Sequence, residues 1–249
     1  MSYRTNIAYL YDGSFVGLLC CVHESYYQKE LPSAIFDYEK ERVMLFPVKE
    51  IVTDEAAAQK VEHSIEYSIS KEALKLVRLC FISNMENREI AILNFLRLGY
   101  KVGELITDML AHDVVRIITK SAGYVQSESH KYKGFLRFSE YDGALAAIIE
   151  PKNFVLPVIA PHFCDRLSNE HFMIYDKTHK YAFIYQNGEG SLIKLEHMEL
   201  PEAGPEEEKY RALWRQFYKT IVIEGRTNTK LRMNHMPKRY WEHLTEFEG

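Results

Sequence analysis

The pattern of apolar and polar residues changes its period along the chain, and it begins as strand, turn and helix. The apolar run Asn6–Tyr11 predicts a short strand, and the polar residues 12–14 predict a turn after it. The segment Phe15–Tyr27 then has the apolar content of a helix, which Asp12 or Ser14 could cap. Alternating residues in Arg42–Val52 suit one or two further strands.

A helical period of apolar positions holds from about residue 54 to residue 125. Thr53 or Asp54 can open the first helix, and Ser70 can open the second. The apolar stripes of the second, third and fourth helices lie at Leu74–Phe81, Ile90–Leu96 and Leu105–Ile118. The fourth helix is expected to begin near Gly103, and no strand signal interrupts these residues.

Two hairpins are predicted beyond residue 130. The dipeptide Asp142-Gly143 is a strong turn signal for the first, and the polar residues 176–180 join the strands of the second. The predicted strands are Gly134–Ser139, Ala144–Glu150, His171–Tyr175, Tyr181–Gln186 and Leu192–His197. A helix over about Ile159–Ser168 separates the hairpins, with Pro157 and Pro161 delaying or kinking its start.

These elements predict an α+β fold. We expect a helical layer over about residues 54–125 and, in the C-terminal half, an antiparallel sheet with hairpin-helix-hairpin-helix order. The expected division is a strand–turn–helix and helical region at 1–130 and an α+β region with a basic aromatic end at 131–249. A chain of 249 residues can bury a sizeable core as one large domain or two smaller ones.

Composition and short motifs indicate which classes of protein the chain can belong to. With 47% apolar and 27% charged residues the chain resembles ordinary soluble proteins. It has no apolar run long enough to span a bilayer and no secretory signal, so a cytoplasmic location without membrane contact is predicted. The four cysteines form no CxxC pair and the histidines lack zinc-site spacing. Neither a metal, a phosphate-binding glycine loop nor any other cofactor is expected.

Charge is concentrated near the C-terminus. Residues 209–241 carry nine Lys or Arg against the single acid Glu224, a local charge of +8. The formal total is -4, so the rest of the chain carries -12. Both tryptophans, Trp214 and Trp241, lie in the same segment. Cations neutralise phosphates and aromatic faces accept unstacked bases, so the segment suits nucleic acid. A basic helix with buried aromatics and solvated charges has the same composition.

The candidate nucleic-acid contacts are the cations of this segment. Three of them are spaced i, i+4 and i+8, which places them on one face of a helix opposite the apolar stripe that includes Trp214. The candidates are Arg211, Arg215, Lys219, Arg226, Lys230, Arg232, Lys238 and Arg239. The tail Met236–Trp241 can serve DNA, or it can be a docking tail in which Trp241 fills a gap in the core.

A catalytic interpretation rests on four polar residues of the second half. His162 and Arg166 lie four apart on the predicted helix, while Arg137 and Asp176 lie on or at the end of strands. Together they could bind a phosphate or supply a general base. The alternative is a buried Arg166–Asp176 ion pair beside a hydrogen-bonded His162. Asp12 could likewise aim a carboxylate into a pocket, or simply cap a helix.

Five segments stand in a fixed order along the chain, namely Tyr11–Phe15, Glu128–Phe138, His162-Phe163 with Arg166, Ile174–Asp176 and Met236–Trp241. Together they resemble a bacterial family of probable DNA metabolism or repair proteins of unknown activity. The resemblance implies work on DNA. It also implies a partner, a radical S-adenosylmethionine protein described as a putative DNA modification or repair protein, and a similarity to proteins fused to a uracil-DNA glycosylase-like domain.

Three functions stay open at this point. The first is a DNA-binding accessory protein that presents a DNA site to its radical partner. The second is an enzyme of base or lesion chemistry that uses the cluster of His162, Arg166 and Asp176. The third is a protein-binding adapter whose +8 segment meets an acidic partner.

Overall fold

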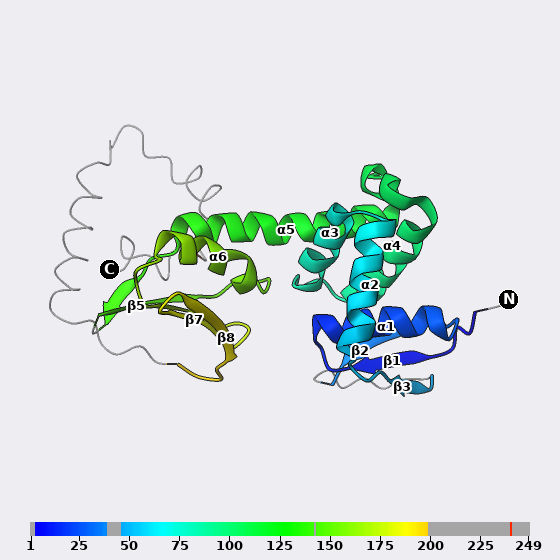
Figure 1. The fold of residues 1–249 in the computed structure, drawn as a ribbon, viewed down its shortest axis with the longest axis horizontal. Coiled ribbons are helices and arrows are strands. Elements are labelled where there is room, and N and C mark those ends of the chain that lie inside the picture. The colour runs from blue at the N-terminus through cyan, green and yellow to red at the C-terminus, as the bar shows by residue number, and fades with distance from the viewer. Residues whose placement is uncertain (1–2, 39–45, 142, 199–239, 241–249) are drawn as a thin grey trace. The chain divides into compact units, whose positions relative to one another are not determined.

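The structure is a computed structural model that describes residues 3–38, 46–141, 143–198 and 240. The chain forms two compact units, Met1–Gln126 and Ser127–Gly249. Helices and strands occur in both units, which confirms a fold of mixed α and β structure (Figure 1). In the described part of the chain no helix has the length and apolar character needed to cross a membrane.

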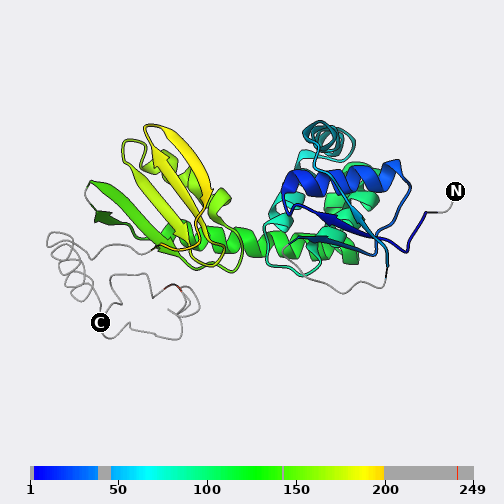
Figure 2. The same ribbon diagram turned by 90° about the horizontal axis from the view of Figure 1, so that it is seen from below.

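The first unit contains a three-stranded sheet in which all strands run parallel. Its central strand is β1 (Ala8–Tyr11), with β2 (Ala34–Asp37) on one side and β3 (Val48–Glu50) on the other (Figure 2). Strands β1 and β3 were predicted, although β3 is shorter than the alternating segment. Strand β2 was not predicted, because four residues without polar alternation give no period to detect.

Helix α1 (Phe15–Tyr27) has the bounds that the sequence predicts. Its N-cap is Ser14, whose Oγ accepts a hydrogen bond from the Gly17 N–H at 2.9 Å. Five consecutive residues, from Leu18 to Val22, are buried, since the helix packs against both β1 and the following helix α2. The helix therefore lacks a clean polar face along this stretch.

Four further helices follow, with one correction to the prediction. They are α2 (Glu55–Ser68), α3 (Lys71–Phe81), α4 (Arg88–Val102) and α5 (Asp113–Phe135). Asp54 caps α2 and Ser70 caps α3. The start predicted for the fourth helix, near Gly103, is wrong, because Gly103–Asp108 forms a 3-10 helix, η1, and α5 begins at Asp113. Gly103 has φ +65°, a left-handed conformation that ends α4 and turns the chain.

The second unit contains a five-stranded sheet whose spatial order follows the sequence. The strands are β4 (Ser139–Tyr141), β5 (Ala144–Ile149), β6 (Phe172–Asp176), β7 (Tyr181–Gln186) and β8 (Glu189–Lys194). Neighbouring strands are antiparallel except β5 and β6, which are parallel. Helix α6 (Leu156–Arg166) carries the chain back between those two. The sheet is thus mixed, which corrects the expectation of a purely antiparallel sheet.

Other boundaries also differ from the expected ones. The strand predicted at Gly134–Ser139 is wrong, because α5 continues through Phe135 and β4 begins only at Ser139. Strand β8 begins at Glu189 and ends at Lys194, earlier than expected. The antiparallel pair β4–β5 is followed by α6 and then by β6, β7 and β8, and the residues for which the last helix was expected lie outside those described.

Candidate functional site

The predicted catalytic cluster does not come together at Asp176. This residue ends β6 and is fully buried, and its Oδ1 accepts the backbone N–H of His179 at 3.0 Å. Its Oδ2 lies 2.7 Å from Nδ1 of the same histidine. Arg166 is exposed at the end of α6, so the expected buried Arg166–Asp176 pair is wrong. The partner is His179, three residues along the β6–β7 turn, which the sequence interpretation missed.

The two remaining members of that cluster have separate surroundings. His162 is half-buried on α6, with its ring edge-on to Phe163 at 5.1 Å between centroids. Arg137 donates to the carbonyls of residues 134–136, where α5 ends. A cation there offsets the negative end of the helix dipole. Among the described residues, the contacts do not join His162, Arg166 and Asp176 to one another.

Asp12 orders the start of α1. Its Oδ1 accepts from the backbone N–H of Ser14 at 2.9 Å and the Ser14 hydroxyl at 2.7 Å, and its Oδ2 accepts from the Thr53 hydroxyl at 2.7 Å. Burial works to raise the pKa of this carboxyl, yet these bonds hold the pKa below its usual value. A Cβ on Gly17 would stand 2.1 Å from Asp12 Oδ1, so only glycine leaves room for this arrangement. The contacts of Asp12 are therefore those of a residue that orders the start of a helix.

Asp12 directly follows β1, at the edge where the strands of the parallel sheet end. Ligands of open α/β sheets bind outside the carboxyl ends of the strands, where the strand order reverses. Asp37 also ends a strand at this edge, and Tyr38 donates to Glu50 at 2.5 Å. Within the described residues, however, there is no group of three or more His, Cys, Asp or Glu that could hold a metal ion.

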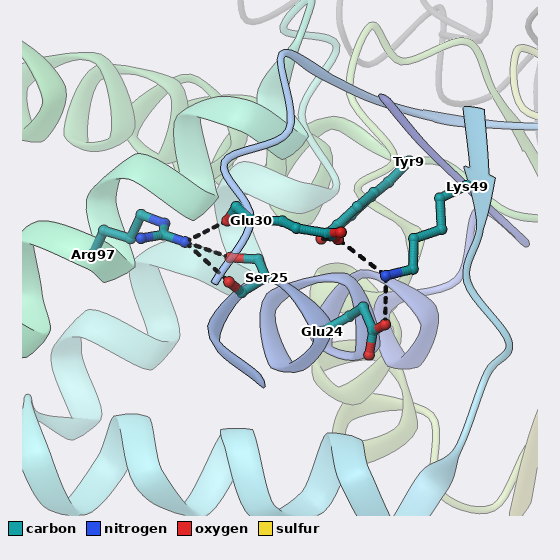
Figure 3. A network of polar contacts seen from close by, with 6 residues as sticks. All are labelled: Tyr9, Glu24, Ser25, Glu30, Lys49 and Arg97. Atoms are coloured by element: carbon teal, nitrogen blue, oxygen red, sulfur yellow. Dashed lines mark hydrogen bonds and ion pairs between the residues drawn. The ribbon is translucent and has the colours of Figure 1, made fainter. Parts of the chain in front are cut away.

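A polar network joins α1, β1, β3 and α4 (Figure 3). Glu30 is its centre, since its Oε2 accepts from the Tyr9 hydroxyl at 2.6 Å and from Lys49 Nζ at 3.0 Å. Lys49 also lies 2.7 Å from Glu24 of α1. Burial acts to raise the pKa of Glu30, and the bonds from Tyr9 and Lys49 outweigh it and lower that pKa. Lys49 pairs with both carboxylates, so these contacts join α1, β1 and β3.

Arg97 of α4 joins this network through hydrogen bonds to residues 25 and 30. It donates to the Ser25 hydroxyl at 2.7 Å and to the Glu30 carbonyl at 2.8 Å. Its guanidinium also lies over the rings of Tyr3 and Tyr26, at 4.8 and 4.7 Å from their centroids. These contacts fix the position of Tyr26 on α1, and Tyr26 borders the groove described next.

Helices α1, α2 and α4 line an open groove with a volume of about 600 Å³. Its lining combines aromatic, basic and hydroxyl side chains over an apolar floor. The lining residues are Val22, His23, Tyr26, Tyr27, Lys60, Val61, Ser64 and Tyr100. The volume lies within the range of small-molecule sites in proteins, about 300–1,000 Å³.

The rings of this groove are held in defined orientations. His23 and Tyr27 stack with centroids 5.9 Å apart and planes 13° from parallel. Tyr26 meets Tyr100 edge to face at 5.5 Å and 84°. Burial raises the pKa of Tyr26 to about 12, despite the opposing charge of Arg97, so its hydroxyl is a neutral donor at physiological pH.

Lys60 is the cation of the groove. It is exposed, and no ion pair to it occurs among the residues that the structure describes. A cation beside exposed ring faces can attract an anionic group attached to a planar ligand. The sequence interpretation missed this groove. The available signal was the i, i+4 spacing of His23 and Tyr27 on a helix.

The predicted DNA contacts all lie outside the described residues. These are Arg211, Arg215, Lys219, Arg226, Lys230, Arg232, Lys238 and Arg239. In the tail the structure describes Tyr240, which is buried and meets Tyr132 and Phe135 of α5 at 5.0 and 5.9 Å between ring centroids. Trp241, to which the docking hypothesis was attached, lies outside the described residues.

A protein-family model matches most of the second half of the chain. Residues 86–246 match the model of a family described as a domain of unknown function, DUF4130, and they make up more than half of the chain. The chain belongs to this family. The matched region includes α4 with Tyr100 but begins after α1 and α2. No curated protein and no solved structure matches the chain.

Proposed function

We propose that the protein is a DNA-binding accessory protein in DNA repair or modification. The observation that carries the proposal is the +8 charge of residues 209–241, which also contain both tryptophans. Attraction of phosphates by cations and stacking of bases on aromatic rings are two forces that proteins use to hold nucleic acid strands. The groove of α1, α2 and α4, whose lining includes Tyr27 and Lys60, offers the same two kinds of side chain.

The alternative of a DNA-processing enzyme depends on the cluster of His162, Arg166 and Asp176. The contacts of Asp176 favour the accessory role, because both of its oxygens are occupied by His179 in a turn. A carboxylate that acts as a base needs an oxygen within reach of substrate. Arg166 stays exposed, so it remains a candidate for contact with phosphate in either function.

The proposal also includes a partner protein. On the basis of the resemblance at the five segments named above, we propose a radical S-adenosylmethionine protein of DNA repair or modification, which acts in the same cytoplasmic compartment. The accessory protein would hold DNA while the partner performs the chemistry. Helix α6 carries the resembling residues His162, Phe163 and Arg166, and strand β6 carries Ile174–Asp176.

The proposal is tested by titrating labelled DNA with the full chain over a range of salt concentrations. If about four cations of the basic segment contact phosphates, the log-log salt slope is about -3 to -4 on duplex DNA, since each contact contributes roughly -0.9. Replacement of Arg211, Arg215 and Lys219 by Ala should flatten this slope by up to about 2.7. Repeating the titration with the radical partner present shows whether the two proteins bind one DNA together.

A charge-matched control separates a local contact from the effect of net charge. Lys71, Lys75 and Arg78 are exposed on α3, and replacing them by Ala removes the same three positive charges. Their ion pairs with Glu72 and Glu62 are at the surface, so this variant should stay folded. Equal slopes for the two triple variants and the wild type would contradict binding through the basic segment.

A further inference from the structure

The exposed face of Tyr27 is the first observation that bears on what the groove binds. Its side chain is 74% exposed although it lines the groove. The His23 imidazole, one helical turn earlier, lies nearly parallel to the ring and holds its orientation. A ring that is already oriented loses little rotamer freedom when a flat ligand stacks on it, so the arrangement favours binding.

A second exposed ring, Tyr67, lies on α2 outside the set of residues that line the groove. Lys60, Ser64 and Tyr67 are spaced i, i+4 and i+7, so they share one face of the helix. Tyr67 is 86% exposed, and the His63 ring lies 17° from parallel to it at 6.3 Å. The pairing of histidine with tyrosine in α1 thus recurs in α2, on the stripe that carries the cation.

The form of DNA follows from what these rings need. In a duplex the base faces are covered by neighbouring base pairs, whereas unpaired bases present free faces to aromatic side chains. The groove has the size of a small-molecule site rather than of a duplex channel. We propose that the groove binds unpaired bases of single-stranded DNA, with Tyr27 as a stacking platform and Lys60 at a phosphate. This inference rests on the proposed DNA-binding function and adds the form of DNA that the groove accepts.

The test compares a single strand of about 15 nucleotides, within the usual site size of such proteins, with the duplex of the same sequence, by fluorescence anisotropy of the full chain. Tyr27→Ala should weaken single-strand binding about 5- to 100-fold, the usual effect of losing one stacking ring. Tyr27→Trp should retain the affinity because it keeps a flat ring. Lys60→Ala should reduce the single-strand salt slope by about 0.7. Duplex binding should be unchanged by all three substitutions.

Tyr124→Ala is the matched control. Tyr124 is 57% exposed on α5 and has Lys120 Nζ 5.8 Å from its ring centroid, so it has the same kind of side chains outside the groove. Its substitution should leave single-strand affinity at the wild-type value. An equal loss in Tyr124→Ala and Tyr27→Ala, or no loss in Tyr27→Ala, overturns the inference for the groove.

Two outcomes of the titration distinguish a failure of this inference from a failure of the proposed function. A wild-type chain that binds duplex DNA but not the single strand overturns the inference and leaves the accessory function standing. A wild-type chain that binds neither form, at low salt and with the radical partner present, overturns both.

Discussion

Asp176→Asn decides whether the shape of the β6–β7 turn or a reaction depends on this carboxylate. The two oxygens of Asp176 accept from two different groups of His179, and the aspartate side chain is fully buried. Asparagine keeps one oxygen and turns an NH₂ group toward the other donor. Hydrogen bonds to a charged group contribute about 1.5–3 kcal/mol each, so we expect a loss of about 2–3 kcal/mol.

That loss is measurable as a lower melting temperature. For a chain of this length 1 kcal/mol corresponds to about 2–4 °C, so the melting temperature should fall by about 4–12 °C. Asp165→Asn is the control, because Asp165 is exposed on α6 and its substitution should change little. If Asp176→Asn melts like the wild type, our structural account of the turn is refuted. If that variant also abolishes a reaction reconstituted with the partner, the enzyme function replaces the accessory one.

Further substitutions test other parts of the fold. Tyr240→Ala should lower the free energy of unfolding, measured by thermal unfolding, by about 3–5 kcal/mol, as large buried aromatic truncations do. Gly17→Ala should destabilise by about 1–3 kcal/mol because its Cβ meets Asp12, whereas Gly123→Ala, with open space around it, should stabilise α5 by about 0.5–1 kcal/mol. Glu30 has a lowered pKa, so its stabilisation is complete above the usual value of 4.5 and is lost as pH falls through the folded-state pKa. Glu30→Gln should therefore flatten the fall of the urea midpoint below about pH 4.5, and an unchanged acid limb would contradict the network of Figure 3.

Local signals in the sequence were sufficient for much of the fold. The bounds of α1 and β7 were predicted fully, and Asp54 and Ser70 were recognised as helix caps, because these features depend on neighbouring residues. The pairing of β5 with β6 was not predictable in this way. Its direction depends on how α6 packs on the sheet, which is a contact between residues distant in sequence.

The groove could not have been predicted for a similar reason. Tyr27 and Lys60 lie on different helices, and Tyr100 on a third, so no spacing in the sequence relates them. What the sequence does contain is each half of the arrangement, such as a histidine four residues before a tyrosine in both α1 and α2. Only the packing of the helices shows that these rings border one space.

Three carboxylates in the segments that carry the resemblance share one structural role. Asp12 accepts the backbone N–H of Ser14, and Asp176 accepts that of His179. Glu128, buried on α5, accepts the backbone N–H groups of residues 152 and 153 at 3.1 and 2.9 Å. A loop that turns sharply leaves such donors without a partner in the main chain, and a carboxylate is the strongest side-chain acceptor available to them.

This shared role changes how the resemblance to DNA-metabolism proteins bears on mechanism. Asp12, Glu128 and Asp176 all lie in the segments that carry it, and their contacts are those of residues that shape loops. A sequence motif of this kind identifies a fold more directly than a reaction, since fold and function are separable. Substitutions at these carboxylates should therefore appear first as losses of stability. Substitutions at Tyr27 and Lys60, which are exposed, should instead appear as losses of binding in a protein that is still folded.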